Sequence, residues 1–317
     1  MALGDVIGHE RAVALLRRAL ETGRVASAYL FAGEQAIGKR FTALNFAKAL
    51  NCRVGCDSMG SATPCASCRK MDSGAHPDLF MVSPEKGVIK VGEIRRIEEA
   101  LSLRPYEGVA KVVIVDSAEA MNQEAANAFL KTLEEPPEHS VIILITSSPD
   151  GLLETMRSRC VRINFKPLSD PDCGAVIRKH GGLKAGISAA AVRLSMGRPG
   201  LALDEDIVKE RDKFIESFEE VLRPGNKPLW KDRAEIERWL DMSFGLLRDM
   251  AVFKITSDAS GLLNRDISDR IGRMCAGTDL KGIIECYERL LRVREHLRFN
   301  LNKTITWNYV GSVLRGL

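Results

Sequence analysis

The first candidate for chemistry is the segment GEQAIGKR, which runs from Gly33 to Arg40. It follows a short apolar run, Tyr29–Phe31, and precedes residues with helical spacing. In that setting Gly-x4-Gly-Lys is typical of a phosphate-binding loop, whose backbone N–H groups and following helix hold phosphate oxygens. We therefore expect Gly33, Gly38 and Lys39 to form a nucleotide site. The alternative is a fortuitous glycine loop.

Two parts that ATP hydrolysis requires are missing from this pattern. P-loop ATPases carry Ser or Thr after the lysine to hold Mg²⁺, and this chain has Arg40 there. Asp116 follows the apolar run KVVIV, where an aspartate helps to hold the metal, but the next residue is Ser117 instead of a glutamate base. Two interpretations are open for Thr146, at the end of VIILIT. Its hydroxyl hydrogen-bonds a γ-phosphate or a water molecule, or the residue has only a structural role at the end of the strand. The sequence predicts a degenerate nucleotide site and leaves binding of ATP or ADP open.

A further arginine stands between a short helix and a strand expected at Val161–Phe165, in the tripeptide Ser158-Arg159-Cys160. An arginine at such a corner is placed to leave its own domain, and its guanidinium neutralises phosphate charge. We expect Arg159 to act on a phosphate that a neighbouring subunit binds.

Four cysteines follow the P-loop helix within a short segment rich in Gly, Ser, Thr and Pro: Cys52, Cys56, Cys65 and Cys68. Four thiolates complete a tetrahedral zinc shell with no open position, so this spacing predicts a structural zinc knot. The alternative is a redox pair at Cys65 and Cys68, but no thioredoxin-like strand precedes it.

Composition excludes several classes of protein. A net charge of +4 over 317 residues is too small to indicate a nucleic-acid binder by itself. The N-terminus carries charges throughout, and no run of about 18 apolar residues occurs, so we expect a cytoplasmic protein with no membrane contact.

These candidate residues need a scaffold that brings them together. Alternating apolar strands and amphipathic helices, including helices at 7–23 and 91–105, predict an α/β domain with a mostly parallel sheet up to about residue 166. From about residue 207 the apolar spacing is helical. Those apolar stripes either pack against partner helices or form internal core.

The chain resembles the AAA+ clamp-loader family of bacterial DNA polymerase III, and within it the delta-prime branch. The resemblance lies in VIGHERAV, GEQAIGKR, the cysteine segment with PCASC, AHPDL, VVIVDSAEAMNQEAANAFLKTLEEPP and MRSRC, and in the closing helix RFNLNKTITWNYVGSVL. It implies an AAA+ domain of P-loop type with a zinc knot (1–166), a small helical lid (167–206) and an all-α collar for oligomerisation (207–317). In the lid, Gly200 stands where the family's motor subunits carry an arginine, with Arg198 two residues earlier.

The resemblance implies a subunit of the DNA polymerase holoenzyme that is not an enzyme on its own. Such a stator-like subunit would close a pentameric ring with gamma/tau motor subunits and delta, and would present Arg159 as an arginine finger in trans. The ring would place the sliding clamp on primer-template DNA during replication. One alternative is an ATP-hydrolysing motor subunit, against which Arg40, Ser117 and Gly200 count. Another is a stand-alone DNA-binding module, for which no sequence motif is evident.

Overall fold

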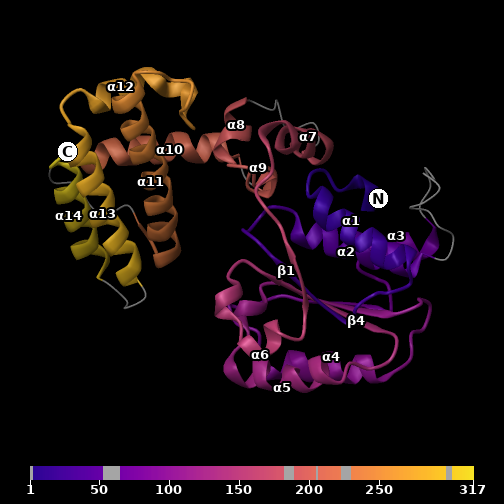
Figure 1. The fold of residues 1–317 in the computed structure, drawn as a ribbon. Coiled ribbons are helices and arrows are strands. Elements are labelled where there is room, and N and C mark those ends of the chain that lie inside the picture. Colours follow the sequence, from indigo (N-terminus) through magenta and orange to yellow (C-terminus); the bar gives the residue numbers. More distant parts are fainter. Residues whose placement is uncertain (1–2, 53–64, 182–188, 205, 223–229, 298–301) are drawn as a thin grey trace. The chain divides into compact units, whose positions relative to one another are not determined.

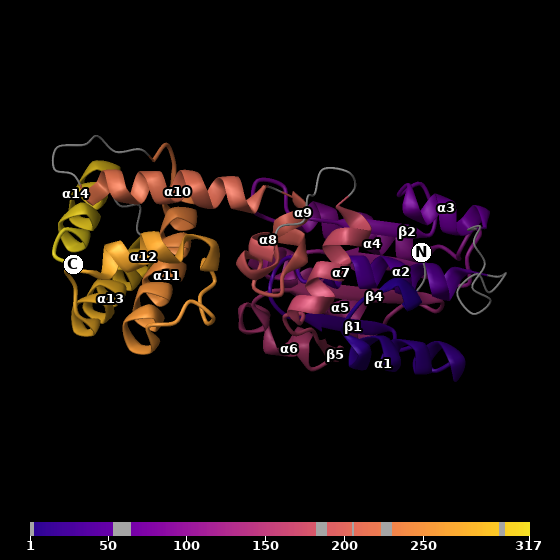
Figure 2. The same cartoon turned by 90° about the horizontal axis from the view of Figure 1, so that it is seen from above.

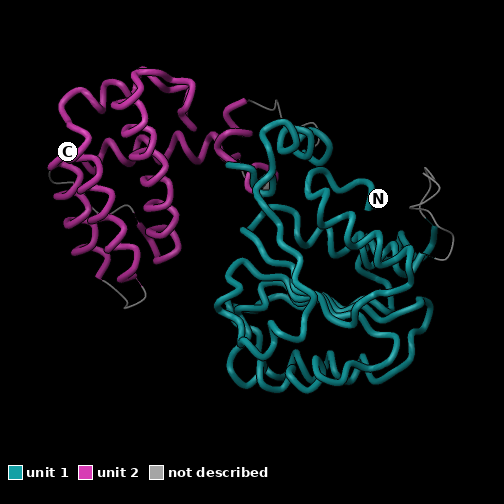
Figure 3. The backbone as a smooth tube through the Cα atoms, in the orientation of Figure 1, with its two compact units in different colours: residues 1–182, 196–200 teal, residues 183–195, 201–317 magenta. Residues whose placement is uncertain are grey.

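The computed structural model describes residues 3–52, 65–181, 189–204, 206–222, 230–297 and 302–317. The chain divides into two compact units (Figure 3). One comprises residues 1–182 and 196–200, and the other comprises residues 183–195 and 201–317. Residues of the predicted lid are thus shared between the two units, and the boundaries at 166 and 206 stay predictions.

The first unit is built on a five-stranded sheet in the order β2-β3-β4-β1-β5, and all neighbouring strands are parallel. The strands are β1 (Ala28–Ala32), β2 (Leu79–Val82), β3 (Lys111–Val115), β4 (Ser140–Thr146) and β5 (Val161–Asn164). Residues of β1, β3 and β4 are buried throughout, as their continuous apolar runs require in a sheet covered on both faces. The predicted parallel α/β domain is confirmed.

Helices cover both faces of this sheet (Figure 1), with α1, α2 and α3 on one side and α4, α5 and α6 on the other. Their bounds are α1 (Glu10–Glu21), α2 (Lys39–Asn51), α3 (Ala66–Asp72), α4 (Val91–Ser102), α5 (Gln123–Glu134), α6 (Glu154–Arg157) and α7 (Asp170–His180). Helix α4 ends three residues before Pro105 instead of reaching it, because the residue before a proline is disfavoured in a helix. Asn122 caps α5 by accepting a hydrogen bond from the Ala125 N–H (2.9 Å).

Alternating strand residues pack against these two helical layers. Leu30, Val113 and Leu144 share one buried cluster with side chains of α4 and α5, such as Ile97 and Phe129. On the opposite face, the Tyr29 ring packs edge-on against Phe46 of α2. Because successive strand side chains point to opposite faces, this arrangement holds the sheet between two layers of helices.

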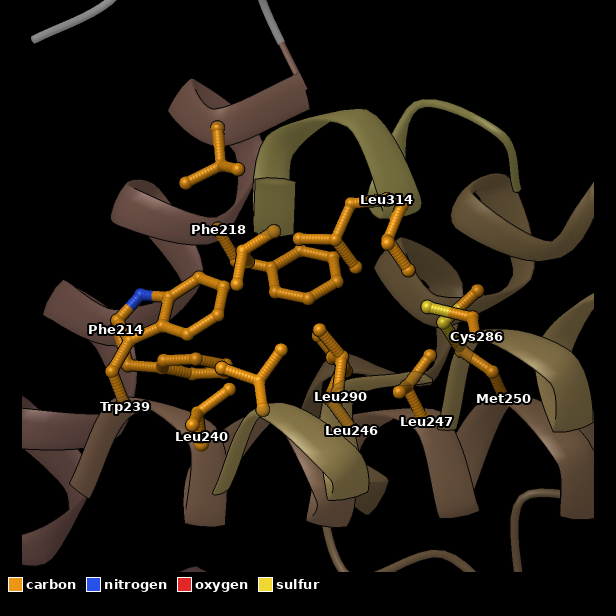
Figure 4. Close-up of a cluster of buried hydrophobic side chains, with 14 of the residues drawn as sticks. Phe214, Phe218, Trp239, Leu240, Leu246, Leu247, Met250, Cys286, Leu290 and Leu314 are labelled. Carbon is orange, nitrogen blue, oxygen red and sulfur yellow. The ribbon is translucent and has the colours of Figure 1, made fainter. Parts of the chain in front are cut away.

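The second unit is helical. Its helices are α8 (Ala189–Leu194), the end of α9 (Pro199–Asp204), α10 (Ile207–Leu222), α11 (Arg233–Thr256), α12 (Ser268–Cys275), α13 (Leu280–His296) and α14 (Lys303–Leu314). Helices α11, α13 and α14 run side by side (Figures 1 and 2). The core of this unit includes Phe214 and Phe218 of α10, Trp239 of α11 and Leu290 of α13 (Figure 4). The apolar stripes of α10 and α13 are therefore largely internal core, which was one of the two predicted alternatives.

No helix within the described ranges combines the length and apolar character needed to cross a membrane.

Candidate functional site

The predicted nucleotide residues meet at the carboxyl edge of the central strands. Strand β1 leads into the loop that begins at Gly33, and its neighbours in the sheet are β4 and β5. The segment after β1 leads to α2 on one face of the sheet, and the segment after β4 leads to α6 on the other face. Open α/β sheets bind ligands where neighbouring strands diverge in this way. The Gly33 N–H donates to the Thr146 carbonyl (3.2 Å), which ties the loop to the end of β4. A side chain on Gly33 would lie 2.5 Å from the Phe165 carbonyl oxygen, so only glycine fits.

Lys39 lies inside the loop and is 6% exposed. Its ammonium group donates to the Gly33 carbonyl (2.6 Å) and to the Glu34 carbonyl. Burial lowers the pKa of Lys39, although the carboxylates of Glu119, Asp116 and Glu34 act in the opposite direction. The lysine predicted to reach phosphates is therefore buried against the loop and held by two of its backbone carbonyls.

Arg40 points to the acidic end of β3. Its Nη1 lies 3.7 Å from Asp116 Oδ2, with the arginine side chain 62% exposed and the aspartate 26% exposed. Asp116 is thus paired with a cation from the position that normally supplies the hydroxyl ligand of Mg²⁺. Thr42, two residues further along the helix, lies on a different side of it, and its Oγ1 donates back to the Gly38 carbonyl (3.0 Å). The residues fit the phosphates of a nucleotide, but they do not fit the magnesium ion.

Glu119 also belongs to this edge, and sequence reasoning did not assign it to the site. Ser117 adopts a left-handed conformation (φ 53°), and a short 3-10 turn, Ala118–Ala120, then folds the chain back. Glu119 Oε1 consequently accepts hydrogen bonds from the Ser147 N–H (3.0 Å) and hydroxyl (2.6 Å), just beyond Thr146. Burial opposes ionisation of Glu119, but these hydrogen bonds outweigh it and the pKa is lowered. Residue spacing alone did not place Glu119 at the site, because it does not reveal the left-handed turn after Asp116.

Thr146 is fully buried at the end of β4, and its Oγ1 accepts a hydrogen bond from the Ser148 N–H (3.0 Å). That contact stabilises the turn after the strand. The Thr146 hydroxyl also contributes to the lowered pKa of Glu119.

Two segments distant in sequence brace the loop. The Gly200 N–H donates to the Ala36 carbonyl (2.9 Å), and a Cβ on Gly200 would lie 2.9 Å from that same oxygen. Arg198 Nε lies 3.6 Å from Glu34 Oε2. On the other side, His9 Nε2 donates to the Ile37 carbonyl (2.8 Å), and burial lowers the pKa of this histidine. The stretches VIGHERAV and SMGRPG therefore hold the loop.

Arg159 lies on the surface at the corner between α6 and β5. Its Nη2 donates to Glu134 Oε1 (2.6 Å) at the end of α5, and its Nη1 donates to the Thr155 carbonyl (2.7 Å). The side chain is 34% exposed. The contacts that the described residues make with Arg159 thus come from its own corner, and none comes from the P-loop.

Three of the four predicted metal ligands converge. The Sγ atoms of Cys52, Cys65 and Cys68 lie within 4.8 Å of one another, and those of Cys52 and Cys65 are 3.9 Å apart. Thiolates at about 2.3 Å from a tetrahedral zinc ion stand at roughly such a separation, so these residues fit a metal. Burial and the neighbouring thiols raise the pKa of Cys68. Cys56, the fourth predicted ligand, lies outside the described residues.

His76 and Asp78 of the AHPDL stretch anchor the region next to this cysteine cluster. His76 Nε2 lies 3.1 Å from the Ser67 hydroxyl of α3. Asp78 is fully buried and accepts N–H groups from Tyr106 (2.7 Å), Glu107 (2.8 Å) and Gly108 (2.7 Å). Burial opposes the charge of Asp78, but these three hydrogen bonds lower its pKa. Both residues have structural roles here.

Comparison with known proteins identifies the family. The model of the family described as DNA polymerase III, delta subunit, matches residues 8–169, which is half of the chain and contains every site described above except Arg198 and Gly200. This chain belongs to that family.

Relatives named as delta′ subunits match either most of the chain or somewhat less than half of it. The DNA polymerase III subunit delta′ of Bacillus subtilis is 29% identical over 312 residues, which cover 92% of each chain. The delta′ subunit of Escherichia coli is 39% identical over 141 residues, covering 44% of this chain and 42% of the relative. These matches confirm the resemblance to the delta-prime subunits of the clamp-loader family.

Relatives named as tau subunits match between about half and four fifths of this chain, and the tau subunit of Bacillus subtilis covers 82% of it at 30% identity. The tau subunit of E. coli is 36% identical over 167 residues, which cover 52% of this chain and 25% of that protein. A solved structure of a DNA polymerase III gamma subunit-related protein from Thermotoga maritima covers 96% of this chain with a TM-score of 0.50. At 21% identity, that likeness supports the AAA+ type of fold.

Proposed function

We propose that this delta-family chain is a non-hydrolysing, stator-like subunit of the replicative clamp loader and acts in the cytoplasm. It occupies one place in a pentameric ring with gamma/tau motor subunits and a delta subunit, and the ring places the sliding clamp on primer-template DNA. Family membership and the near full-length match to a delta′ subunit support this assignment.

One observation carries the non-hydrolysing part of the proposal, namely the pairing of Arg40 with Asp116. Hydrolysis at a P-loop depends on a metal held between an aspartate and a hydroxyl, and on a base that orients water. Here the aspartate faces a guanidinium and the next residue is Ser117. The chain itself therefore splits no ATP.

The arginine finger is the second part of the proposal. Arg159 is partly exposed at a corner formed by α6 and β5, where Glu134 and Thr155 orient its guanidinium. It supplies positive charge to a triphosphate that an adjacent motor subunit holds, an effect that is worth about three to five orders of magnitude in rate. The finger exchanges its single bond to Glu134 for bonds to phosphate oxygens, which guanidinium groups bind through two parallel N–H donors.

The cysteine cluster completes the proposal as a structural zinc site formed by Cys52, Cys65, Cys68 and Cys56. Three thiols with suitable separations support it. Zinc bound there joins the C-terminal end of α2 to the start of α3, and a shell of four thiolates leaves no position for catalysis.

An ATP-hydrolysing motor subunit is a second candidate, because one observation favours it. Glu119 places a carboxylate near the carboxyl edge where a motor subunit carries its base, and it interacts favourably with Lys39. However, both Glu119 contacts to Ser147 use the same oxygen and hold the side chain against β4.

Phosphate release separates the two candidates. Purified chain is incubated with ATP and Mg²⁺, and we expect release at the buffer rate. A matched Glu119→Gln variant identifies any true turnover, since a base at this position would lose it. Turnover that exceeds the buffer rate and disappears in Glu119→Gln would establish the motor function and reject the stator.

A further inference from the structure

We propose that the P-loop binds the phosphates of a nucleoside di- or triphosphate as the metal-free anion, with Arg40 in the place of Mg²⁺. The inference concerns the chain's own nucleotide site and rests only on the non-hydrolysing part of the proposed function. It does not depend on Arg159, on the zinc site or on any partner.

The loop keeps the geometry of a phosphate cradle. Gly38 (φ 103°) caps the thirteen-residue helix α2, and Ala36 is also left-handed (φ 61°), so backbone conformation is specialised on both sides of Ile37. The loop is held at three points, through Thr146, Gly200 and His9. A loop braced in this way loses little conformational entropy when an anion binds.

The metal position is the part that has changed. Magnesium at a P-loop is held by a carboxylate oxygen at the end of a strand and by a hydroxyl oxygen at the start of the helix. In this chain the strand end, Asp116, faces the Arg40 guanidinium at 3.7 Å, and the nearest helix hydroxyl, Thr42, is bonded to the Gly38 carbonyl. A divalent cation would have to displace a guanidinium and would gain one protein ligand instead of two.

Arg40 is suited to the replacement role. Its side chain is 62% exposed, so the guanidinium can turn toward a β- or γ-phosphate while Asp116 continues to balance part of its charge. Guanidinium groups bind phosphate oxygens through two parallel N–H bonds. One arginine therefore neutralises and orients the phosphates that the metal bridges elsewhere.

A second arginine, Arg198, has an N–H donor that forms no hydrogen bond with the described residues. Arg198 Nε is buried and has no hydrogen-bond partner among the described residues, and its approach to Glu34 Oε2 at 3.6 Å is an ion pair without a hydrogen bond. A buried N–H without an acceptor costs free energy, which a phosphate oxygen at this side of the loop would recover. Lys39, Arg40 and Arg198 then surround the loop with three cations.

This arrangement predicts an inverted response to magnesium. Mg²⁺ bound to a nucleotide screens the oxygens that Arg40 would contact and brings a divalent charge beside that guanidinium. Mg²⁺ in excess should therefore weaken binding to this chain, whereas it strengthens binding to P-loop ATPases.

The experiment is a calorimetric titration of the full chain with ATP and with ADP, once in EDTA and once in excess MgCl₂. We expect binding in EDTA that is about tenfold tighter than in MgCl₂, in line with the loss of one charge-assisted pair. Arg40→Ser restores a hydroxyl next to Asp116, so Mg²⁺ should tighten binding by that variant. Lys39→Ala should lose binding under both conditions, and Lys131→Ala, an exposed lysine on α5, should bind like the unaltered chain.

Two outcomes overturn the inference. One is binding by the unaltered chain that requires Mg²⁺, and the other is no measurable binding in either buffer. Phosphate release measured in the same samples reports separately on the proposed lack of hydrolysis, so the two proposals fail independently.

Discussion

Two regions of the α/β unit each place a partly exposed arginine against a carboxylate, and they differ in what the carboxylate would otherwise do. In the P-loop, Arg40 lies 3.7 Å from Asp116, a position that serves as a metal ligand in P-loop ATPases. At the α6–β5 corner, Arg159 lies 2.6 Å from Glu134, a residue at the end of a surface helix. The first pair occupies a carboxylate at the edge of the sheet and, in the proposed function, prevents hydrolysis there, whereas the second orients a cation that remains at the surface.

The difference shows that an ion pair has no fixed functional meaning. Exposed pairs contribute only about 0–1 kcal/mol to stability, so neither arginine is needed chiefly to hold the fold. What differs between the two pairs is their effect on a functional group: one engages the Asp116 carboxylate, and the other orients the Arg159 guanidinium at the surface. The following predictions test that contrast, beginning with the largest expected effect.

Arg159→Ala should lower ATP hydrolysis by the assembled clamp loader at the adjacent motor site by about 10³-fold, because the finger charge is lost from the transition state. The measurement is steady-state phosphate release by the reconstituted complex with clamp and primed DNA. Arg162→Ala is the matched control, since Arg162 is an exposed arginine on β5 that contacts Asn164. If the two variants hydrolyse ATP equally well, Arg159 is a structural arginine and the contrast with Arg40 fails.

Cys65→Ser should remove the metal and lower the melting temperature of the chain by about 5–10 °C, because structural zinc contributes directly to folding free energy. Metal analysis should give one zinc per chain before the substitution and less than a tenth of that after it. Helix α2 carries Lys39 at its start and leads to Cys52 at its end, so this variant also tests whether the P-loop depends on the cysteine cluster.

Cys160→Ser is the control for that experiment, because Cys160 lies outside the cluster and should leave the zinc content unchanged. Unaltered chain that purifies without zinc, and that neither takes it up nor gains stability from it, would reject the metal site.

Gly200→Ala should destabilise the α/β unit by about 1–3 kcal/mol, since the new methyl group meets Ala36 at 2.9 Å. Faster hydrogen exchange of the loop amides from Gly33 to Lys39 should accompany the loss. Gly245→Ala provides the comparison, because nothing lies within 4 Å of a Cβ there and alanine favours the α11 helix by about 0.5–1 kcal/mol. Unchanged exchange in Gly200→Ala would mean that the brace on the P-loop is not rigid.

Glu134→Gln should have the smallest effect. The substitution keeps the shape of the side chain but removes the charge that holds Arg159, so hydrolysis by the adjacent motor site should change by no more than about fivefold, the equivalent of roughly 1 kcal/mol. Comparison with Glu135→Gln, its exposed neighbour, isolates the contribution of the pair. A loss as large as that in Arg159→Ala would make Glu134 an essential part of the finger.

Much of the fold and several site residues could be predicted because their signals are local. The apolar runs of β1, β3 and β4 each depend on residues only a few positions apart, and all three were found where expected. The spacing of Gly33, Gly38 and Lys39 likewise placed a loop between a strand and a helix, where the structure has it. That Arg40 and Ser117 leave catalytic parts missing stays a prediction.

Contacts between distant segments could not be predicted in the same way. Glu119 was not assigned to the site from the sequence, yet a left-handed Ser117 turns it toward β4. Gly200 was noted only for the arginine it lacks, whereas its N–H holds the loop at Ala36.

The sequence by itself determined the family, the parallel α/β framework and the types of residue at the nucleotide loop, because short-range spacing and side-chain chemistry specify them. Tertiary structure alone decided that Arg40 pairs with Asp116 and that Arg159 is held by Glu134. Both pairs join segments that meet only after the strands take the order β2-β3-β4-β1-β5, and that order arises from burial of the whole sheet between its helices.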